Sequence, residues 1–426
     1  MNRPFFFMVP FWGERYRRYF LELLLPSLLA PGNLPQLRSA DDHRFLIATT
    51  DEDWNAIADH PLMVRLAAHA PALHVQIPPP DAPTAPGATS AILHQNLAQK
   101  RLVEFAWHYR AKGCLFSPDC IISDGMVLAL VRRAARGETL VRCPALRHKE
   151  ETCLAELANY RPTDPSAPLV VPPRALADMM VRNLHPEVAI FEEGHPAQMP
   201  IAPLVYWRIP GGMVMHNLYA APVLMDYSAI DRHDTNCLKD HIFEEDYVAR
   251  NFADCPLNVV TDSDEFCILS VTPAAEWAAP IAPTVKRSRF MQRCSIAASL
   301  VLNGHGLRQR RELFRQPIIW HDGDIDKAVT NKIARIVSPA FRPHYRLLGY
   351  LLYLGTMTPW AGRWIILRDR LARAMRGDRK TWAKIVRRFF PRKTCTCGPE
   401  WAWPTYRPGS DTAIVECANC GARSGD

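Results

Sequence analysis

The sequence predicts an α/β protein with a mostly parallel central sheet flanked by helices. From Phe5 to Cys143, short apolar runs alternate with segments of helical periodicity, the pattern of strand–helix–strand units. The runs are apolar throughout, as in strands that a parallel sheet buries on both faces. A chain of 426 residues has room for two or three folding units.

The first strand is expected at Phe5–Val9, before the loop Pro10-Phe11-Trp12-Gly13. A helix over 14–29 follows, because its aromatic and leucine residues recur at helical spacing until Pro31-Gly32-Asn33 ends it. The remaining expectations follow from the same patterns. Further strands are predicted at 44–49, 73–77, from Cys114 onward, after Asp119, and at 138–143, 203–209, 213–217, 257–261 and 266–271. Further helices are predicted at 51–69 with a break at Pro61, and at 89–111, 126–136, 174–184, 287–302, 327–336 and about 364–390.

Asp119 is the leading candidate for a functional acid. It follows the apolar run from Cys114 and precedes a short apolar strand and a second turn at Ser123-Asp124-Gly125. Open α/β sheets bind ligands outside the carboxyl ends of their strands. The alternative is that Asp119 only caps a turn, as aspartates commonly do. Asp124 has a similar alternative as a turn or helix N-cap residue.

A second acidic segment, Asp262-Ser263-Asp264-Glu265, lies between the apolar runs 257–261 and 266–271. Two carboxylates at this spacing suit a hard divalent cation. Four polar positions between two strands equally fit a solvated hairpin loop, so both interpretations remain open.

The order of these elements resembles the GT-A fold of nucleotide-sugar-dependent glycosyltransferases, over roughly residues 1–275. The resemblance lies in Phe7–Tyr16, which is like the family's opening strand and nucleotide-binding loop, and in Ser117–Gly125, which is like its acidic segment after the fourth strand. It implies donor-binding roles for Pro10, Trp12, Tyr16, Asp119 and Asp124. For Trp12 and Tyr16, ordinary packing is the alternative.

The sequence departs from the family's Asp-x-Asp motif at this point, because Asp119 is followed by Cys120-Ile121. A literal Asp-x-Asp exists later in the chain, at Asp262-Ser263-Asp264. A leaving nucleoside diphosphate needs its charge neutralised by Mg²⁺ or Mn²⁺, or by cationic groups and helix N-termini. An inverting transfer also needs a base. The predicted catalytic residues are Asp119, Asp262, Asp264 and Glu265, and the candidate bases also include Glu192 and Glu193.

The C-terminal segment predicts a structural zinc site. Cys395-Thr396-Cys397 and Cys417-Ala418-Asn419-Cys420 form two pairs with nineteen residues between them. Four thiolates suit tetrahedral Zn²⁺ and leave no open position for catalysis. Free thiols are the alternative. The eight other cysteines are scattered, several inside apolar runs, which favours reduced core thiols and a cytoplasmic protein.

Positive charge is concentrated near the C-terminus. The segment 363–393 holds twelve Lys or Arg and two acids, while the whole chain has a net charge of +8. A basic amphipathic helix at 381–390 would suit the anionic inner face of a membrane, or would pack with a solvated basic face. The N-terminal apolar stretch is too short for a signal peptide.

The sequence therefore predicts three domains: a GT-A-like catalytic domain (1–275), a basic helical region (276–390) and a zinc-ribbon-like tail (391–426). The leading function is transfer of a sugar from a nucleotide-sugar donor to a glycan or lipid-linked acceptor. One alternative is a nucleic-acid-binding protein that uses the zinc tail and the basic helices. Another is a different α/β nucleotide-dependent transferase, although the chain has no Gly-x-Gly-x-x-Gly or Walker loop.

Overall fold

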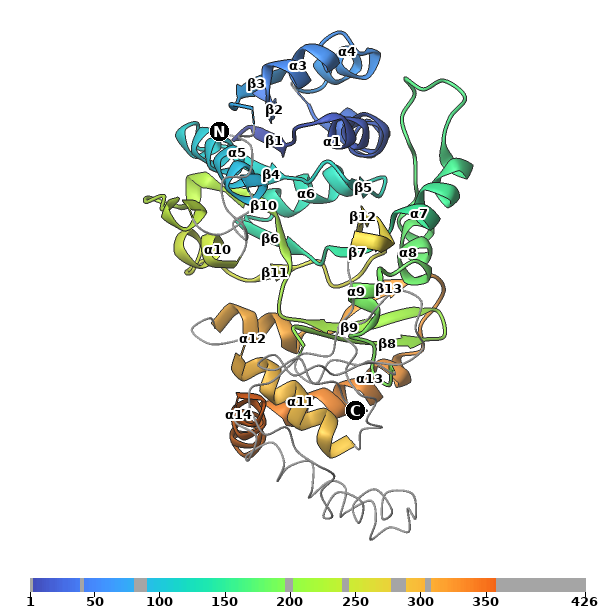
Figure 1. The fold of residues 1–426 in the computed structure, drawn as a ribbon, viewed down its shortest axis with the longest axis vertical. Coiled ribbons are helices and arrows are strands. Elements are labelled where there is room, and N and C mark those ends of the chain that lie inside the picture. The colour runs from blue at the N-terminus through green and yellow to red at the C-terminus, as the bar shows by residue number, and fades with distance from the viewer. Residues whose placement is uncertain are drawn as a thin grey trace, which may run out of the picture. The chain divides into compact units, whose positions relative to one another are not determined.

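The computed structural model describes residues 3–38, 42–79, 90–195, 202–239, 245–276, 289–302 and 308–357. Within it the chain forms two compact units (Figure 1). The first contains residues 1–185, 209–274 and 316–325, and the second contains 186–208, 275–315 and 326–426. The predicted zinc-ligating cysteines and the basic helix at 364–390 lie outside the described residues.

A seven-stranded sheet forms the centre of the first unit, in the order β11-β6-β10-β4-β1-β2-β3. Its strands are β1 (Phe5–Pro10), β2 (Arg44–Thr49), β3 (Ala72–Gln76), β4 (Lys112–Leu115), β6 (Leu140–Cys143), β10 (Ala221–Asp226) and β11 (Asn258–Val259). Strands β1, β2, β3 and β4 pair in parallel, and β10 runs antiparallel to both β4 and β6. Since β11 is parallel to β6, six of the seven strands share one direction. The prediction of a mostly parallel sheet is confirmed.

Helices cover both faces of this sheet, as the apolar strands require. In β1, Phe5 and Phe7 pack in one apolar cluster with the π-helical turn (Phe20–Leu24) that follows α1 (Glu14–Tyr19), and with helices α2 (Leu25–Leu28) and α6 (Met126–Ala135). The alternate residues Phe6 and Met8 pack in a second cluster with α5 (Ser90–His108) and α10 (Glu245–Asn251). Alternate side chains of a strand point to opposite faces, so this strand is buried on both sides, and Figure 1 shows α5 and α10 together on one flank.

The helix predicted over 14–29 is interrupted by a π-helical turn at Phe20–Leu24, between α1 and α2. Pro26 has no backbone N–H, so it cannot donate to the carbonyl four residues earlier. The N–H of Leu25 instead donates to the carbonyl of Phe20, which is the wider spacing of a π turn. The break predicted at Pro61 in the helical segment 51–69 is confirmed, because the segment forms two helices, α3 (Asp51–Ile57) and α4 (Pro61–Ala67).

Smaller sheets extend the first unit beyond the central one. Strand β12 (Ile268–Thr272) lies between β5 (Cys120–Ile122) and β7 (Leu146–Lys149). Strand β13 (Ile318–His321) pairs antiparallel with β9 (Gly212–Asn217). Helices α7 (Glu150–Leu157) and α8 (Pro173–Arg182) complete the unit.

The second unit is mainly helical in its described residues. It contains α9 (Pro186–Ala189), β8 (Leu204–Ile209), α11 (Arg289–Leu302), α12 (Arg308–Arg315), α13 (Lys327–Val337) and α14 (Pro343–Met357). Helices α11 and α14 pack closely at Gly349, where an added Cβ would lie 2.5 Å from the backbone of Ala297. None of the helices within the described ranges combines the length and the hydropathy that crossing a membrane requires.

Candidate functional site

The carboxyl edge of the central sheet contains a topological switch point. The chain runs from β1 outward to β2 and β3 on one side, and then returns to β4 on the other side of β1. The loops after β1 and β4 therefore diverge, and a crevice between such loops is where open α/β sheets bind ligands. Strand β11 runs in the same direction, so the loop that follows it leaves the same edge of the sheet.

Asp119 lies in a turn four residues after the end of β4 and is half-buried. One carboxylate oxygen accepts a hydrogen bond of 2.6 Å from the hydroxyl of Ser270 on β12, and the other bonds the Ser117 hydroxyl. Its backbone carbonyl accepts from the N–H of Val271. These contacts orient the carboxylate but supply no positive charge, so it can still act on a cationic ligand.

The loop after β1 is held by an acid that the sequence did not single out. Buried Asp53 accepts hydrogen bonds of 2.8 Å from the Gly13 N–H and from the Arg17 guanidinium. Pro10 is buried at the end of β1, while Trp12 is half-buried with its ring edge-on to His94 at 4.5 Å. The contact with His94 supports ordinary packing as the role of Trp12.

Tyr16 is 40% exposed on α1. Its ring lies edge-on to the ring of Tyr19, at 5.9 Å. The guanidinium of Arg15 lies 5.7 Å from the Tyr16 ring centroid. Tyr16 is therefore an accessible aromatic surface at the start of the helix that follows β1.

Asp124 connects two loops through a hydrogen bond. Its side chain accepts a hydrogen bond of 2.6 Å from the N–H of Gly32, which joins the turn before α6 to the loop after α2. An added Cβ at Gly32 would lie 2.7 Å from this same carboxylate oxygen. The structure thus gives this predicted donor-binding acid a contact that suits a turn residue.

The acidic segment at 262–265 does not close a hairpin. The strands on either side, β11 and β12, belong to different sheets, so the hairpin interpretation is wrong. The segment is instead anchored to β13: buried Ser263 donates its N–H to the Ile319 carbonyl and accepts from the His321 N–H. This pairing brings a histidine from far along the chain to the two aspartates.

Asp262, Asp264 and His321 form a compact group of side chains. Each offers one ligand atom, and these atoms lie within 4.8 Å of one another. The Nε2 atom of His321 is 3.4 Å from a carboxylate oxygen of Asp262, and its Nδ1 is 3.2 Å from the Gly323 carbonyl. The histidine side chain is only 14% exposed, whereas the aspartates face solvent.

Arg174, at the start of α8, provides the countercharge. Its guanidinium donates two hydrogen bonds of 2.9 Å to the two carboxylate oxygens of Asp264 and one of 3.0 Å to Asp324. The hydrogen bonds from Arg174 hold the pKa of Asp264 below its usual value. A cation that binds this group must share Asp264 with Arg174 or displace it.

Asp262, Asp264 and His321 could together hold a divalent metal ion, because their ligand atoms lie close enough to share one. Two carboxylates and one imidazole form a mixed oxygen and nitrogen set. Mg²⁺ and Ca²⁺ prefer all-oxygen surroundings, whereas imidazole suits transition metals. Of the two ions expected from the sequence, Mn²⁺ is therefore the better match.

The other predicted acids are engaged elsewhere. Both carboxylate oxygens of Glu265 accept hydrogen bonds from Arg133, at 2.7 and 2.5 Å. Hydrogen bonding to Glu265 raises the pKa of Arg133. In the second unit, Glu192 pairs with Arg208 at 3.3 Å and Glu193 accepts from the Gln292 amide at 2.8 Å.

The sequence did not indicate Arg174 or His321 as site residues. They lie 88 residues before and 59 residues after Asp262, and no local spacing links them to it. The run Ile318–Trp320 before His321 is a strand signal of the same kind as the one before Asp262. It could have marked His321 as a residue at a strand end.

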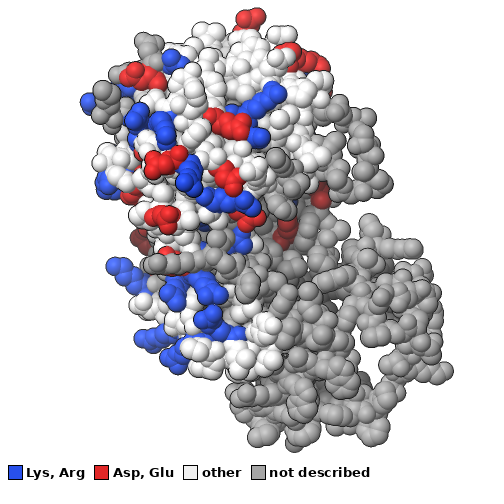
Figure 2. Space-filling view, turned by 90° about the vertical axis from the view of Figure 1, so that its left-hand side faces the viewer, with Lys and Arg blue, Asp and Glu red and all other residues white. Residues whose placement is uncertain are grey.

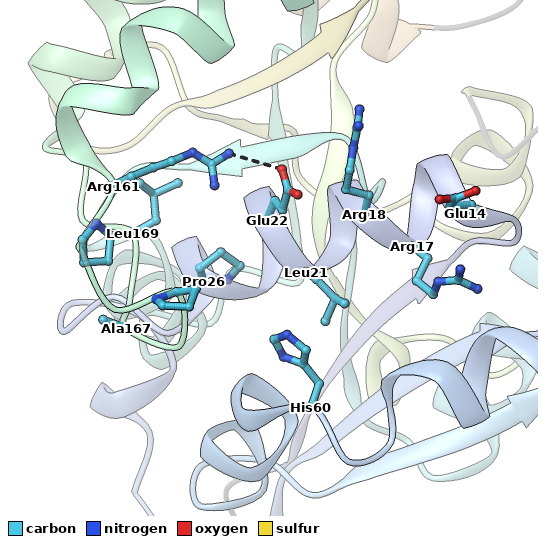
Figure 3. Close-up of a pocket in the computed structure, with 12 residues that line it drawn as sticks. Glu14, Arg17, Arg18, Leu21, Glu22, Pro26, His60, Arg161, Ala167 and Leu169 are labelled. Carbon is cyan, nitrogen blue, oxygen red and sulfur yellow. Dashed lines mark ion pairs between the residues drawn. The ribbon is translucent and has the colours of Figure 1, made fainter.

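A surface groove of about 540 Å³ lies along the outer side of α1, the π-helical turn and α2, and is lined by residues of these three segments, His60 and the loop 161–169 (Figure 3). Its arginines each lie within 4 Å of a carboxylate: Arg161 with Glu22, Arg17 with Asp53, and Arg18 with Glu150. The charge of the groove is therefore balanced, and its lining does not single out a ligand.

No protein-family model matches the sequence, and neither does any curated protein. Among solved structures, the chain is similar to crystal structures of Staphylococcus aureus TarS. For TarS 1–349 the identity is 15% over 34% of this chain and 36% of that chain, with a TM-score of 0.21. For TarS 1–349 in complex with UDP-GlcNAc it is 13% over 82% and 75%, with a TM-score of 0.30. For TarS it is 13% over 82% and 45%, with a TM-score of 0.26. These scores do not establish a shared fold.

Proposed function

We propose that the chain is a GT-A-like glycosyltransferase that moves a sugar from a nucleotide-sugar donor to a glycan or lipid-linked acceptor. The observation that carries the proposal is the placement of the acids. Asp119 follows β4, while Asp262 and Asp264 follow β11. Because β4 and β11 run in the same direction, both acidic segments leave the same edge of the sheet, which also contains the switch point.

Such an edge suits a donor with a diphosphate leaving group. In the proposal, the loop after β1 receives the nucleotide, with Trp12 and Tyr16 offering aromatic surface. Asp262, Asp264 and His321 would hold the divalent ion, which neutralises charge on the leaving diphosphate when it is bound. Asp119, oriented by Ser270, has no ion-pair partner among the described residues, so it is free to accept a hydrogen bond from a sugar or acceptor hydroxyl.

Other nucleotide chemistries fit this edge less well. Dinucleotide and ATP sites use closely spaced glycines, so that backbone N–H groups can approach the phosphates. The loop after β1 contains the single glycine Gly13, whose N–H is already bonded to Asp53. Charge neutralisation at this edge must therefore come from a metal ion or from side chains rather than from a glycine-rich loop.

The test is donor binding and donor hydrolysis by the full chain. UDP-, GDP-, CMP- and dTDP-sugars are screened by thermal shift, with and without Mn²⁺, and sugar release is measured for any that bind. Asp119→Asn should abolish release while the melting temperature stays the same. Asp178→Asn, which changes an exposed acid on α8 paired with Arg182, is the matched control. The proposal fails if no donor raises the melting temperature in either condition.

A further inference from the structure

The helices of the second unit have a strongly basic surface. Within 289–302, 308–315 and 326–357 there are eleven Lys or Arg and two acids. Figure 2 shows basic side chains gathered on the α11–α14 part of the visible face, where acidic side chains are sparse. Such a surface attracts anions through the electrostatic field of all its charges. It also contains a pocket lined by three arginines.

The pocket is small, about 50 Å³, and lies between α11, α12 and α14. Arg311 and Arg315 of α12 and Arg346 of α14 line it. Its apolar lining comes from Leu300 and Val301 of α11 and from Phe341. A water molecule needs roughly 10–15 Å³ of such space, so the pocket admits a group larger than a single water.

The three arginines face each other without an acid. No acid is found among the described residues that line the pocket, and none of the three guanidiniums has a carboxylate within 4 Å in the described part of the chain. Arg315 lies 4.8 Å from the centre of the Phe341 ring. Partial burial, Arg346 and Arg315 together lower the pKa of Arg311. Like charges held this close repel one another, and an anion placed between them would relieve the repulsion.

We propose that this pocket binds a phosphate group. Guanidiniums match phosphate oxygens with paired hydrogen bonds, and three of them complement a doubly charged phosphate monoester. The proposal is independent of the glycosyltransferase proposal, because it uses only residues of the second unit.

The surroundings favour a phosphate on a lipid headgroup. Leu347 and Tyr350 are 61% and 46% exposed. Together with Arg346 they occupy one face of α14, because residues three and four apart are neighbours on a helix. Exposed apolar side chains beside a phosphate site would contact the hydrocarbon and interface of a bilayer, whereas a small soluble phosphate would not need them.

The experiment measures two kinds of binding by the full chain. One arm is sedimentation with vesicles of phosphatidylcholine, with or without phosphatidic acid. The other arm is the thermal shift induced by inorganic pyrophosphate. Arg311→Gln and Arg346→Gln should each weaken phosphate-dependent binding about tenfold or more, the scale of a charge-assisted hydrogen bond. Arg335→Gln removes an equal charge from α13 outside the pocket and serves as the matched control.

The outcomes separate the sources of the phosphate. If the bound phosphate belongs to a lipid headgroup, Leu347→Ser should weaken vesicle binding and leave the thermal shift induced by pyrophosphate unchanged. A soluble source predicts a pyrophosphate shift that needs Arg311, with no preference for phosphatidic acid. The proposal is overturned if Arg311→Gln and Arg335→Gln behave alike in both arms. That result would describe a diffuse basic surface. Without ligand, Arg311→Gln should be at least as stable as the wild type, because it relieves the repulsion.

Discussion

The ion pair between Glu265 and Arg133 allows a sharp test of which acids in the 262–265 segment act on a ligand. The Arg133 side chain is 11% exposed and also pairs with Glu138 at 2.7 Å. Glu265→Gln removes the charge from a two-pronged contact but keeps the shape. Hydrogen bonds to a charged partner contribute about 1.5–3 kcal/mol, so we expect a loss of about 2 kcal/mol. For a unit of this size the melting temperature should fall by roughly 4–8 °C.

The assay combines urea unfolding with donor turnover measured well below the melting temperature. Glu265→Gln should lower stability and leave turnover unchanged. Arg133→Met should cost more, about 3–5 kcal/mol, because it leaves the partly buried Glu265 carboxylate without a partner. Glu138 keeps its ion pair with Arg136 at 2.8 Å. The double variant should lose less than the sum of the two single changes, since both disturb one contact. Glu22→Gln, in an exposed pair 3.6 Å from Arg161, should have almost no effect.

The reverse outcome would refute this reasoning. If Glu265→Gln folds with unchanged stability but loses turnover, Glu265 acts on a ligand and its contact with Arg133 is incidental. Asp262→Asn and Asp264→Asn should show the opposite pattern from that expected for Glu265→Gln: a larger loss of Mn²⁺-dependent rate than of stability. If both aspartate variants turned over donor as fast as the wild type, the group of Asp262, Asp264 and His321 would have no role in the reaction.

Three further predictions concern the metal group, the pH dependence and the tail. Arg174→Gln should tighten Mn²⁺ binding measured by calorimetry, because Asp264 loses a competing cation; weaker binding would mean that Arg174 helps to build the site. Burial lowers the pKa of His148 from 6.5 to about 3. Between these two pH values the unfolded chain binds a proton at this histidine and the native chain does not, so the free energy of unfolding falls by about 1.4 kcal/mol for each pH unit of acidification. His148→Gln should reduce that slope between pH 6 and pH 4, and an unchanged slope would contradict the assignment. Residues 391–426 should contain one structural zinc per chain by metal analysis, and deleting them should spare donor hydrolysis; zinc-free protein with four titratable tail thiols would defeat this prediction.

Local sequence pattern determined the central sheet well. Buried parallel strands must be apolar on both faces, so Phe5–Val9 and Arg44–Thr49 were recognisable without any tertiary information. The acids at the strand ends were visible for the same reason, since Asp119 and Asp262 interrupt apolar runs. Strand β10 escaped prediction. It is the one antiparallel strand of the sheet, and its partners β4 and β6 lie far from it in sequence.

The composition of the site was decided by tertiary structure. Pairing of Ser263 with Ile319 and His321 places an imidazole beside Asp262, and the packing of the fold brings Arg174 to Asp264. The same packing places Glu265 in contact with Arg133 and Asp124 in contact with the N–H of Gly32. Acids with similar sequence surroundings therefore have different partners. Sequence pattern shows which residues a strand buries and where it ends, because these depend on neighbours along the chain. Which charges meet at those ends depends on contacts between distant segments, which only the folded chain defines.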